Sequence, residues 1–492
     1  LDVKTQRVRE VVCDSPKLKF TWATPRFSPD GNEVFFDAQV EGDRNRVQLV
    51  AVDLTKPNPK VRVLTNPKRS RNSPRALRGW LGDTMLFLAN DDGYNNLYRY
   101  NRKTSKIAQL TRFKEDITSA QITNAGIFAV HRTPRGSTLV IVEPTTGKVL
   151  GELARPGTAD VLDADKGRVL WSQRAPDIFT EINLAHLDPG AAGQAPGLQN
   201  HRVVSLPDEL SKKIVQCRAE AVTIPTFDRD PATGKTRELH AFVLHPTQPR
   251  QNPEQRLALI TAFYGGRNRY SSFDNIMCAA GLTIVSPAVR GSSGFGKHFY
   301  GLNDKDLGGD EIVDLHAVAR WVEQEFALKP HQIGVYGGSH GGYATMRALT
   351  FPPETNARNA SYPFGFGMAH AGFSDIKTFY DATNIPDWVV LESGDPNKPA
   401  ELARMKDRSP LTHVNRLQSP LLLTHGSNDW RVPVTESRQF AAAGRKLGRP
   451  VKYVEFPGQG HHIEGLDLQM QLYQARFDFL TSVVELAGQS GN

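Results

Sequence analysis

The sequence has little cysteine and no long apolar run. Cys13, Cys217 and Cys278 are an odd number of cysteines at wide spacings. They predict neither a disulfide framework nor a cysteine-based metal site, and they favour a reducing, cytoplasmic compartment. A secreted or periplasmic location after signal removal stays open, because the chain begins at Leu1 rather than Met and we expect an upstream segment to have been removed. The N-terminus itself has no basic-then-apolar signal pattern.

Membrane and nucleic-acid partners are not predicted. No stretch reaches the ~20 apolar residues that a spanning helix needs. The net charge is +8, and the densest basic run is Lys68, Arg69, Arg71, Arg75 and Arg78. No aromatic stacking platform or binding motif accompanies this run, so we interpret it as a solvated loop between β-elements rather than a nucleic-acid patch. With 39% hydrophobic and 23% charged residues, the chain has the composition of an ordinary globular protein.

The first 210 residues contain short β-rich runs that recur with turns between them. The repeat is ~40–50 residues with three or four strands in each, which is typical of propeller blades. Four units are clear, and flanking strands can complete a fifth, so we predict a β-propeller-like lid domain over residues 1–210 that is short or incomplete. The alternative is a β-sandwich with irregular strands. The candidate strands are residues 34–36, 47–54, 61–64, 85–89, 97–100, 107–110, 127–130, 139–142, 169–171 and 182–187.

Residues 211–492 alternate between apolar strands and amphipathic helices. The strands are continuous apolar runs, as expected where both faces of a sheet are covered. Strand–helix alternation predicts a doubly wound, mostly parallel sheet, the α/β-hydrolase type of catalytic domain. The candidate strands are residues 257–263, 282–286, 333–336, 366–370, 421–424 and 451–456, and the candidate helices are residues 312–326, 436–446 and 466–486.

The strongest chemical signal is G-G-S-H-G-G at residues 337–342. It follows an apolar strand and precedes a helix-like segment, which is the setting that a G-x-S-x-G nucleophile elbow requires. The glycines let strand and helix approach closely around a strained turn, and the helix N-terminus faces developing negative charge. We therefore predict Ser339 as a nucleophile.

A serine nucleophile needs a base and an acid that orients the base. In this fold they follow in the order serine, acid, histidine, in loops after later strands. Asp429 and His461 occupy such loops. A turn-capping role is the alternative for Asp429, and Asp375 and Asp387 are weaker rivals; His462 is the rival of His461. We expect His340 and His425 to be structural neighbours of the site.

The oxyanion of an acyl-transfer reaction needs two hydrogen-bond donors. The backbone N–H of His340 is one candidate. The hydroxyl of Tyr264, or a nearby amide, is the other, since Tyr264 follows the strand at residues 257–263. The alternative for Tyr264 is packing at the strand end. This chemistry needs no metal and no organic cofactor.

At these residues the sequence resembles the prolyl oligopeptidase family of serine peptidases. The Tyr264 segment, R-G-S-S-G-F-G at 290–296, G-G-D at 308–310, the elbow and the Asp429 and His461 segments fall in the family's order. The elbow, I-P-D-W at 385–388 and D-W-R-V-P at 429–433 resemble the acylaminoacyl peptidase branch. The resemblance implies that Tyr264 is the oxyanion tyrosine and that Arg431 binds a substrate carbonyl; a structural salt bridge is the alternative for Arg431.

The resemblance also bears on specificity. Dipeptidyl peptidases of the family hold a free N-terminus with two adjacent glutamates, and this chain has no Glu-Glu pair. We therefore predict a serine peptidase acting on short peptides, including those with a blocked N-terminus, and we leave a homo-oligomer open. The alternatives are an esterase acting on small acyl esters, with the same chemistry in a different pocket, and a propeller scaffold with an idle hydrolase domain.

Overall fold

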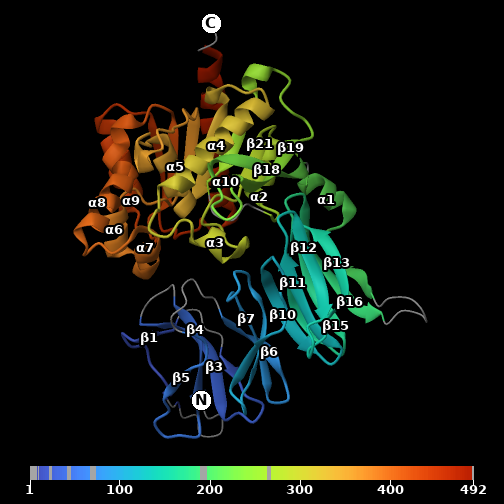
Figure 1. Ribbon diagram of the computed structural model, residues 1–492. Helices are drawn as coiled ribbons and strands as arrows, with labels where there is room; N and C mark the ends of the chain where they lie inside the picture. Colours follow the sequence, from blue (N-terminus) through green and yellow to red (C-terminus); the bar gives the residue numbers. More distant parts are fainter. Residues whose placement is uncertain are drawn as a thin grey trace. The chain divides into compact units, whose positions relative to one another are not determined.

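The computed structural model describes residue 8 and residues 10–20, 25–41, 46–66, 74–188, 197–215, 217–262 and 268–489 (Figure 1). The chain divides into two compact units. The first unit contains residues 1–174, 180–206 and 294–299, and the second unit contains residues 175–179, 207–293 and 300–492.

The first unit is a series of antiparallel sheets, each made of strands that are consecutive in the chain. Within the described residues there are four such sheets. The first has the order β1-β3-β4-β5 with β2 paired to β3, and the other three are four-stranded meanders. Their strands are β1 (Leu18–Lys19), β2 (Arg26–Phe27), β3 (Glu33–Val40), β4 (Val47–Asp53) and β5 (Val61–Val63); β6 (Arg75–Leu81), β7 (Thr84–Ala89), β8 (Asn96–Asn101) and β9 (Lys106–Gln109); β10 (Ile117–Thr123), β11 (Gly126–Arg132), β12 (Gly136–Val142) and β13 (Val149–Pro156); and β14 (Thr158–Asp165), β15 (Arg168–Ala175), β16 (Ile178–Asp188) and β17 (Gly197–Val204).

Neighbouring sheets of the first unit bury apolar faces against each other. Phe35 of β3 packs with Phe87 of β7, and Leu86 of β7 packs with Ala129 of β11. Phe128 of β11 in turn packs with Trp171 of β15. Because successive residues of a strand point to opposite faces, β7 and β11 each contribute to two neighbouring cores. This is the blade-on-blade stacking of a propeller, and it excludes the alternative of two facing sheets.

Two expectations for the first unit have different outcomes. The described part of the chain holds four blades, and a fifth is not found there. Lys68, Arg69 and Arg71 of the basic run lie outside the described residues, whereas Arg75 and Arg78 lie in β6 with exposed side chains.

The second unit is built on one eight-stranded sheet with the order β18-β19-β21-β20-β22-β23-β24-β25. The pairs β18–β19 and β19–β21 are antiparallel. All the other neighbouring pairs in this order, from β21–β20 to β24–β25, are parallel. The elements are α1 (Asp208–Ile214), β18 (Cys217–Arg229), β19 (Thr236–Pro246), β20 (Ala258–Thr261), α2 (Ser272–Ala279), β21 (Thr283–Pro287), α3 (Gly296–Gly301), α4 (Asp310–Glu325), β22 (Ile333–Gly338), α5 (His340–Leu349), β23 (Phe366–His370), α6 (Ile376–Ala382), α7 (Pro386–Ser393), α8 (Pro399–Arg408), β24 (Leu421–Gly426), α9 (Thr435–Lys446), β25 (Val451–Phe456) and α10 (Leu466–Gln489).

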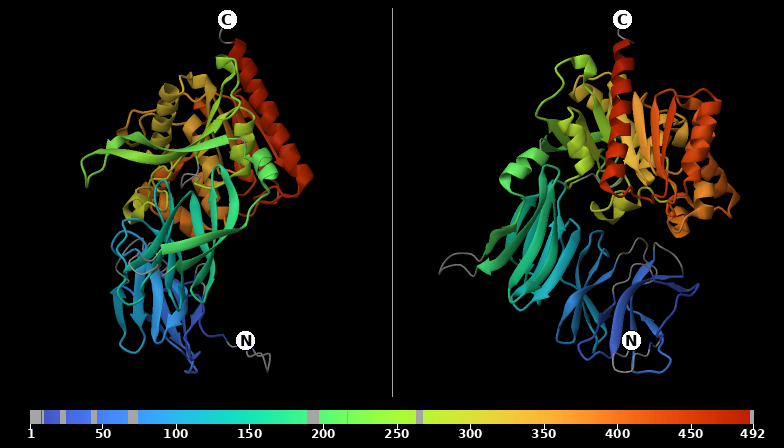
Figure 2. Two further views of the ribbon diagram at one scale, coloured as in Figure 1. Left: turned by 90° about the vertical axis from the view of Figure 1, so that its right-hand side faces the viewer. Right: turned by 180° about the vertical axis from the view of Figure 1, so that it is seen from behind.

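Helices cover both faces of this sheet. On one face, Phe273 of α2 and Phe479 of α10 pack against strand residues that include Met368 of β23. On the other face, Met346 of α5 and Phe440 of α9 pack against a different set of strand residues. The figures show that α5 and α10 lie on opposite faces of the sheet. In Figure 1, α5 lies in front of the sheet, and in the rear view of Figure 2 the red α10 lies in front of it. The predicted fold class, a propeller followed by a doubly wound α/β-hydrolase, is confirmed.

The prediction of no disulfide was wrong. Cys217, the first residue of β18, forms a disulfide with Cys278 of α2. The two cysteines are 61 residues apart in sequence, so their spacing carries no signal. They meet because β18 pairs with β19, β19 pairs with β21, and α2 directly precedes β21. The argument from cysteine usage for a reducing compartment thereby loses its basis.

Cys13 is exposed and is not part of a disulfide. Among the described helices, none combines the length and the apolar composition needed to cross a membrane.

Candidate active site

Ser339 occupies a sharp turn between β22 and α5. Its backbone φ is 57° and its ψ is −122°, a region that residues with a side chain rarely adopt. A Cβ on Gly337 would lie 2.6 Å from the backbone of Gly341, and one on Gly342 would lie 2.8 Å from the carbonyl oxygen of His370. The strand–turn–helix setting therefore requires glycine at 337 and 342, and the turn projects a strained Ser339.

Backbone hydrogen bonds hold this turn in place. The Ser339 N–H donates to the carbonyl of His370 over 2.8 Å, and the Ser339 carbonyl accepts from the Tyr343 N–H over 3.0 Å. Ser339 is thus the residue that caps α5, and His340 is the first residue of that helix. The first N–H groups of a helix have no partner within the helix, so the N–H of His340 belongs to the donors that a helix offers to an anion.

Asp429 and His461 contact each other directly. His461 Nδ1 lies 2.7 Å from Asp429 Oδ2, and the Asp429 side chain is fully buried whereas that of His461 is 20% exposed. The other carboxylate oxygen accepts the N–H groups of Arg431 and Val432, each over 2.9 Å. Burial alone would raise the pKa of Asp429, but hydrogen bonds from His425, His461 and Val432 lower it well below its usual range. The carboxylate is therefore ionised at working pH.

His425 is a second histidine on the same carboxylate. Its Nε2 lies 3.2 Å from Asp429 Oδ2 and 2.9 Å from the Val432 carbonyl, and its Nδ1 lies 2.7 Å from Ser437 Oγ. The ring is completely buried. Since Nε2 must donate to the carbonyl, its N–H is shared with the carboxylate, and Ser437 supplies the proton that Nδ1 accepts. His425 thus fixes the orientation of Asp429.

The loops that carry Asp429 and His461 are joined to each other. The Ser427 N–H donates to the carbonyl of Phe456 over 3.0 Å, and the Asn428 N–H donates to that of Gln459 over 2.8 Å. A Cβ on Gly426 would lie 2.2 Å from the Gly460 carbonyl oxygen. Glycine at 426 therefore permits the close approach that brings the carboxylate to the imidazole.

Behind the elbow, His340 meets a buried carboxylate that the sequence analysis missed. Glu311, in the first turn of α4, is 1% exposed, and its Oε2 lies 3.4 Å from His340 Nε2. Its other oxygen accepts the Gly308 N–H over 2.8 Å. The Trp388 ring lies edge-on to the His340 ring at 6.0 Å between centroids. The G-G-D motif at 308–310 was the available signal, because Glu311 directly follows it.

Arg431 is placed beside the acid by its own backbone. Its N–H donates to Asp429, and its carbonyl accepts from Thr383 Oγ1 over 2.8 Å. The guanidinium lies over the Trp430 ring, 5.3 Å from the centroid, and that ring is 64% exposed. Within the described part of the chain, the buried Nε of Arg431 has no hydrogen-bond partner.

The remaining candidates fall into three groups. Tyr264 lies outside the described residues. Asp375 caps α6, where it accepts the N–H groups of Lys377 and Thr378, and Asp387 lies in the first turn of α7. The exposed ring of His462 stands against that of His461 at 5.4 Å between centroids. No three His, Cys, Asp or Glu side chains gather as a metal-binding group in the described residues.

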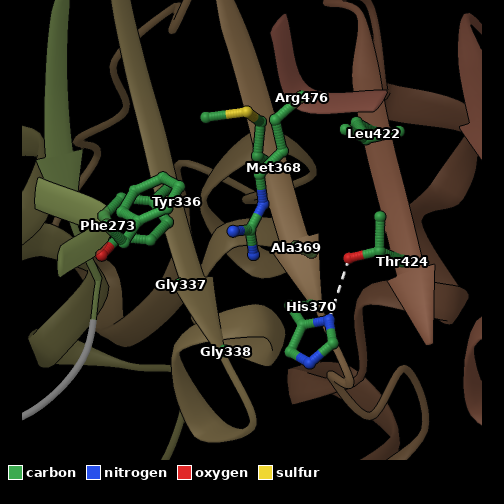
Figure 3. Close-up of a pocket in the computed structure, with 10 residues that line it drawn as sticks. All are labelled: Phe273, Tyr336, Gly337, Gly338, Met368, Ala369, His370, Leu422, Thr424 and Arg476. Atoms are coloured by element: carbon green, nitrogen blue, oxygen red, sulfur yellow. Dashed lines mark hydrogen bonds between the residues drawn. The ribbon is translucent and has the colours of Figure 1, made fainter. Parts of the chain in front are cut away.

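A cavity of about 160 Å³ lies directly behind the elbow (Figure 3). The rings of Phe273 and Tyr336, with centroids 4.2 Å apart, line one side, and His370 and Thr424 line another. The Arg476 guanidinium extends from α10 between these sides and lies 4.6 Å from the centre of the Phe273 ring. The cavity therefore borders the two residues that precede Ser339, Gly337 and Gly338.

Comparison with known proteins fits this geometry. The pattern of the Prolyl oligopeptidase family matches residues 269–486, which hold the elbow and both loops. The second unit belongs to the prolyl oligopeptidase family. This is a family of serine peptidases, and the second unit is an enzyme domain of it.

Curated relatives of this chain include proteins named as peptidases. It is 27% identical over 376 residues to dipeptidyl aminopeptidase BIII of Pseudoxanthomonas mexicana, covering 68% of this chain and 53% of that protein. It is 25% identical over 243 residues to the acylamino-acid-releasing enzyme of Homo sapiens, covering 47% of this chain and 32% of that protein. The chain thus spans about half or less of the length of these relatives.

Solved structures share the fold of the whole chain. A puromycin-hydrolysing peptidase of Mycobacterium tuberculosis matches 97% of this chain and 71% of its own, with a TM-score of 0.78 and 18% identity. An acylaminoacyl peptidase in complex with a chloromethyl ketone matches 94% of this chain and 70% of its own, with a TM-score of 0.70 and 18% identity.

Proposed function

We propose that this protein is a serine peptidase that hydrolyses short peptides through an acyl-enzyme on Ser339. The observation that carries the proposal is the 2.7 Å contact between His461 Nδ1 and the buried carboxylate of Asp429. This contact commits the Nδ1 proton to Asp429, so that Nε2 is left as the acceptor for a serine proton. Strained backbone at Ser339 supports the assignment, since such strain clusters at functional sites.

The reaction that we propose uses the catalytic triad and two oxyanion donors. His461 Nε2 takes the Ser339 proton as Oγ attacks the substrate carbonyl, and Asp429 stabilises the imidazolium that forms. The N–H of His340 and the hydroxyl of Tyr264 stabilise the tetrahedral oxyanion. His461 next gives its proton to the leaving amine. Water, deprotonated by the same nitrogen, releases the acyl group and restores Ser339.

Arg431 is proposed to bind the substrate. A guanidinium carries a planar set of donors that suits a carbonyl or carboxylate oxygen. Its buried Nε has no partner in the described residues. Arg431 follows the acid by two positions in the sequence, and its backbone N–H donates to the Asp429 carboxylate. The absence of an ion pair of Arg431 among the described side chains weighs against a structural salt bridge.

We propose peptides with a blocked N-terminus as the preferred class. The motifs shared with the acylaminoacyl peptidase branch and the relatives named acylamino-acid-releasing enzymes support this choice, and the lack of a Glu-Glu pair weighs against recognition of a free N-terminus. An esterase acting on small acyl esters remains the alternative, because it would use the same nucleophile and base.

Three substrates in one assay test these proposals. They are an N-acetylated tripeptide amide, the same tripeptide with a free amine, and a small activated ester. A peptidase specific for blocked N-termini has its highest kcat/KM on the first, whereas turnover of the ester alone would favour an esterase. Ser339→Ala should abolish all turnover, and Ser361→Ala, at an exposed serine, is the matched control. A Ser339→Ala enzyme that still turns over any of them would refute the nucleophile.

The division into a lid domain of residues 1–210 and a catalytic domain of residues 211–492 stays a prediction. A propeller lid should exclude folded substrates, so short peptides should be cut at least ~100-fold faster than the same sequence displayed in a folded protein. Equal rates would refute the lid.

A further inference from the structure

The segment that joins α6 to α7 contains a threonine whose hydroxyl forms hydrogen bonds in two directions. Thr383 directly follows α6, and the I-P-D-W motif at residues 385–388 begins two residues later and supplies the cap and the first residues of α7. The Thr383 hydroxyl donates to the carbonyl oxygen of Arg431 over 2.8 Å. The same hydroxyl oxygen accepts the N–H of Ile385 over 3.3 Å. One side chain therefore links the I-P-D-W motif to the loop that follows Asp429.

The carbonyl that Thr383 contacts belongs to a peptide group that is also bound to Asp429. The peptide between Arg431 and Val432 donates its N–H to Asp429 Oδ1 over 2.9 Å, and its carbonyl is the acceptor of the Thr383 hydroxyl. The N–H of Arg431 itself donates to the same carboxylate oxygen over 2.9 Å. The main chain is thus held on both sides of the Arg431 Cα, which fixes the direction in which this side chain leaves the loop.

The direction of the Arg431 side chain matters because its guanidinium is the proposed contact with substrate. The guanidinium lies over the Trp430 ring, 5.3 Å from the centroid, and this ring is exposed. A cation–π contact at an exposed site contributes little, so the main chain does more than the ring to preorganise the guanidinium. A displacement of about 1 Å in a substrate-positioning group can cost ~10²-fold in rate.

Beyond Thr383, hydrogen bonds continue toward His340. The carbonyl of Ile385 accepts the Trp388 N–H over 3.0 Å, and the Trp388 ring lies edge-on to the His340 ring at 6.0 Å between centroids. The I-P-D-W motif is thereby held between the proposed substrate contact at one end and the residue of the proposed oxyanion donor at the other. Thr383 forms the link at the first of these ends.

We propose that Thr383 is a positioning residue that holds the main chain of Arg431 and thereby directs its guanidinium toward a peptide substrate. The inference deepens the proposed function and rests on it, because it takes Arg431 as the substrate contact. It assigns to Thr383 no contact with substrate.

Substitutions of Thr383 separate the hydroxyl from the shape of the side chain. Thr383→Val keeps the shape and loses the donor and the acceptor, so kcat/KM for an N-acetylated tripeptide amide should fall ~5–20-fold. A small activated ester lacks the group that Arg431 binds and should be hydrolysed at close to the wild-type rate. Thr383→Ser keeps the hydroxyl and should recover most of the loss. Thr412→Val is the matched control with unchanged kinetics, because this exposed threonine also donates to a backbone carbonyl, that of Lys406 over 2.7 Å.

A double-mutant cycle tests whether Thr383 acts through Arg431. If it does, Thr383→Val should cost nothing further once the guanidinium is gone, so the double variant should match Arg431→Ala on the peptide within about twofold. Independent effects would multiply instead. The rate at which a fluorophosphonate labels Ser339 should stay at the wild-type value in Thr383→Val, because labelling requires the nucleophile and its base but not the contact with a peptide.

The outcomes are distinguishable. The positioning role is overturned by wild-type kcat/KM in Thr383→Val beside an impaired Arg431→Ala, by losses that multiply in the double variant, or by equal losses on peptide and ester. If Arg431→Ala itself cleaves the peptide at the wild-type rate, the substrate contact proposed for Arg431 is wrong, and the inference about Thr383 fails with it. If the wild-type protein is not labelled at Ser339, the proposed nucleophile is wrong.

Discussion

Replacing Asp429 by asparagine should reverse the tautomer of His461. The two backbone N–H groups of Arg431 and Val432 donate to Asp429 Oδ1, so the amide oxygen of the asparagine must take that place. In the wild-type protein, Asp429 Oδ2 lies against both His461 Nδ1 and His425 Nε2. In the variant, the amide NH₂ takes the place of Oδ2 and faces these two nitrogens. A donor opposite Nδ1 requires that nitrogen to accept, which moves the ring proton to Nε2.

The size of the expected loss in kcat follows from the reversed tautomer of His461. With its proton on Nε2, His461 cannot take the proton of Ser339, although the fold and the substrate site are intact. The corresponding substitution in a serine protease triad lowers kcat by ~10⁴, which is about 5.4 kcal/mol of transition-state stabilisation. We expect a loss of this size in Asp429→Asn, with KM changed by less than about threefold.

Steady-state kinetics on an N-acetylated peptide measure the loss, with fluorophosphonate labelling as a second readout. Asp375→Asn is the matched control, because Asp375 caps α6 with a side-chain oxygen that asparagine also provides. An Asp429→Asn enzyme within ~10-fold of wild type would refute the tautomer argument and, with it, the assignment of Asp429.

Three further predictions concern the substrate, the fold and pH. Arg431→Ala should lower kcat/KM for peptides ~10–100-fold and leave small esters almost unaffected, with Arg431→Lys intermediate; equal losses on both substrates would show that Arg431 supports the fold. Arg290→Met should destabilise the protein by ~3–5 kcal/mol in urea unfolding, because it leaves the fully buried Asp314, which lies 2.8 Å from Arg290, without its cation; a change below ~1 kcal/mol would contradict this. Burial lowers the pKa of both His316 and His370 to about 3 from 6.5, so the unfolded chain binds more protons between these values, and the free energy of unfolding should fall as pH drops through this window, by up to ~1.4 kcal/mol per unit and histidine. His316→Gln should reduce that slope by one histidine, and an unchanged slope would refute the argument.

The fold was predictable where local pattern and burial agree. In the second unit, β22, β23 and β24 are apolar runs buried on both faces, and each was predicted within two residues of its observed bounds. In the first unit, inner strands such as β7 and β12 are continuous and buried, and they were predicted too.

Some of the strands that were not predicted are exposed. β13 and β17 have mostly partly buried or exposed residues, with charged side chains among them, and their apolar signal is correspondingly weak. β18 and β19 are long antiparallel strands at the start of the eight-stranded sheet and were missed as well. β18 pairs with β19, and β19 also pairs with β21, which begins at Thr283. The pairing with β21 joins segments that a local pattern does not relate.

The candidate site shows the same division. The sharp turn at Ser339 was predictable because its steric constraints lie within six consecutive residues. The contacts of Glu311 with His340 and of His370 with Thr424 join residues 29 and 54 positions apart, and no spacing rule relates them. His425 was expected near the site, yet its hydrogen bond to the carboxylate depends on how the loop at residues 426–432 folds back.

The most direct test of the account is to find where an active-site label attaches. The purified protein is treated with a fluorophosphonate, digested, and analysed by mass spectrometry for the modified peptide. The account predicts one stoichiometric adduct on Ser339, absent in Ser339→Ala and slowed ~10²-fold or more in His461→Ala. An adduct on another residue, or none on a protein that still cleaves peptides, would contradict it.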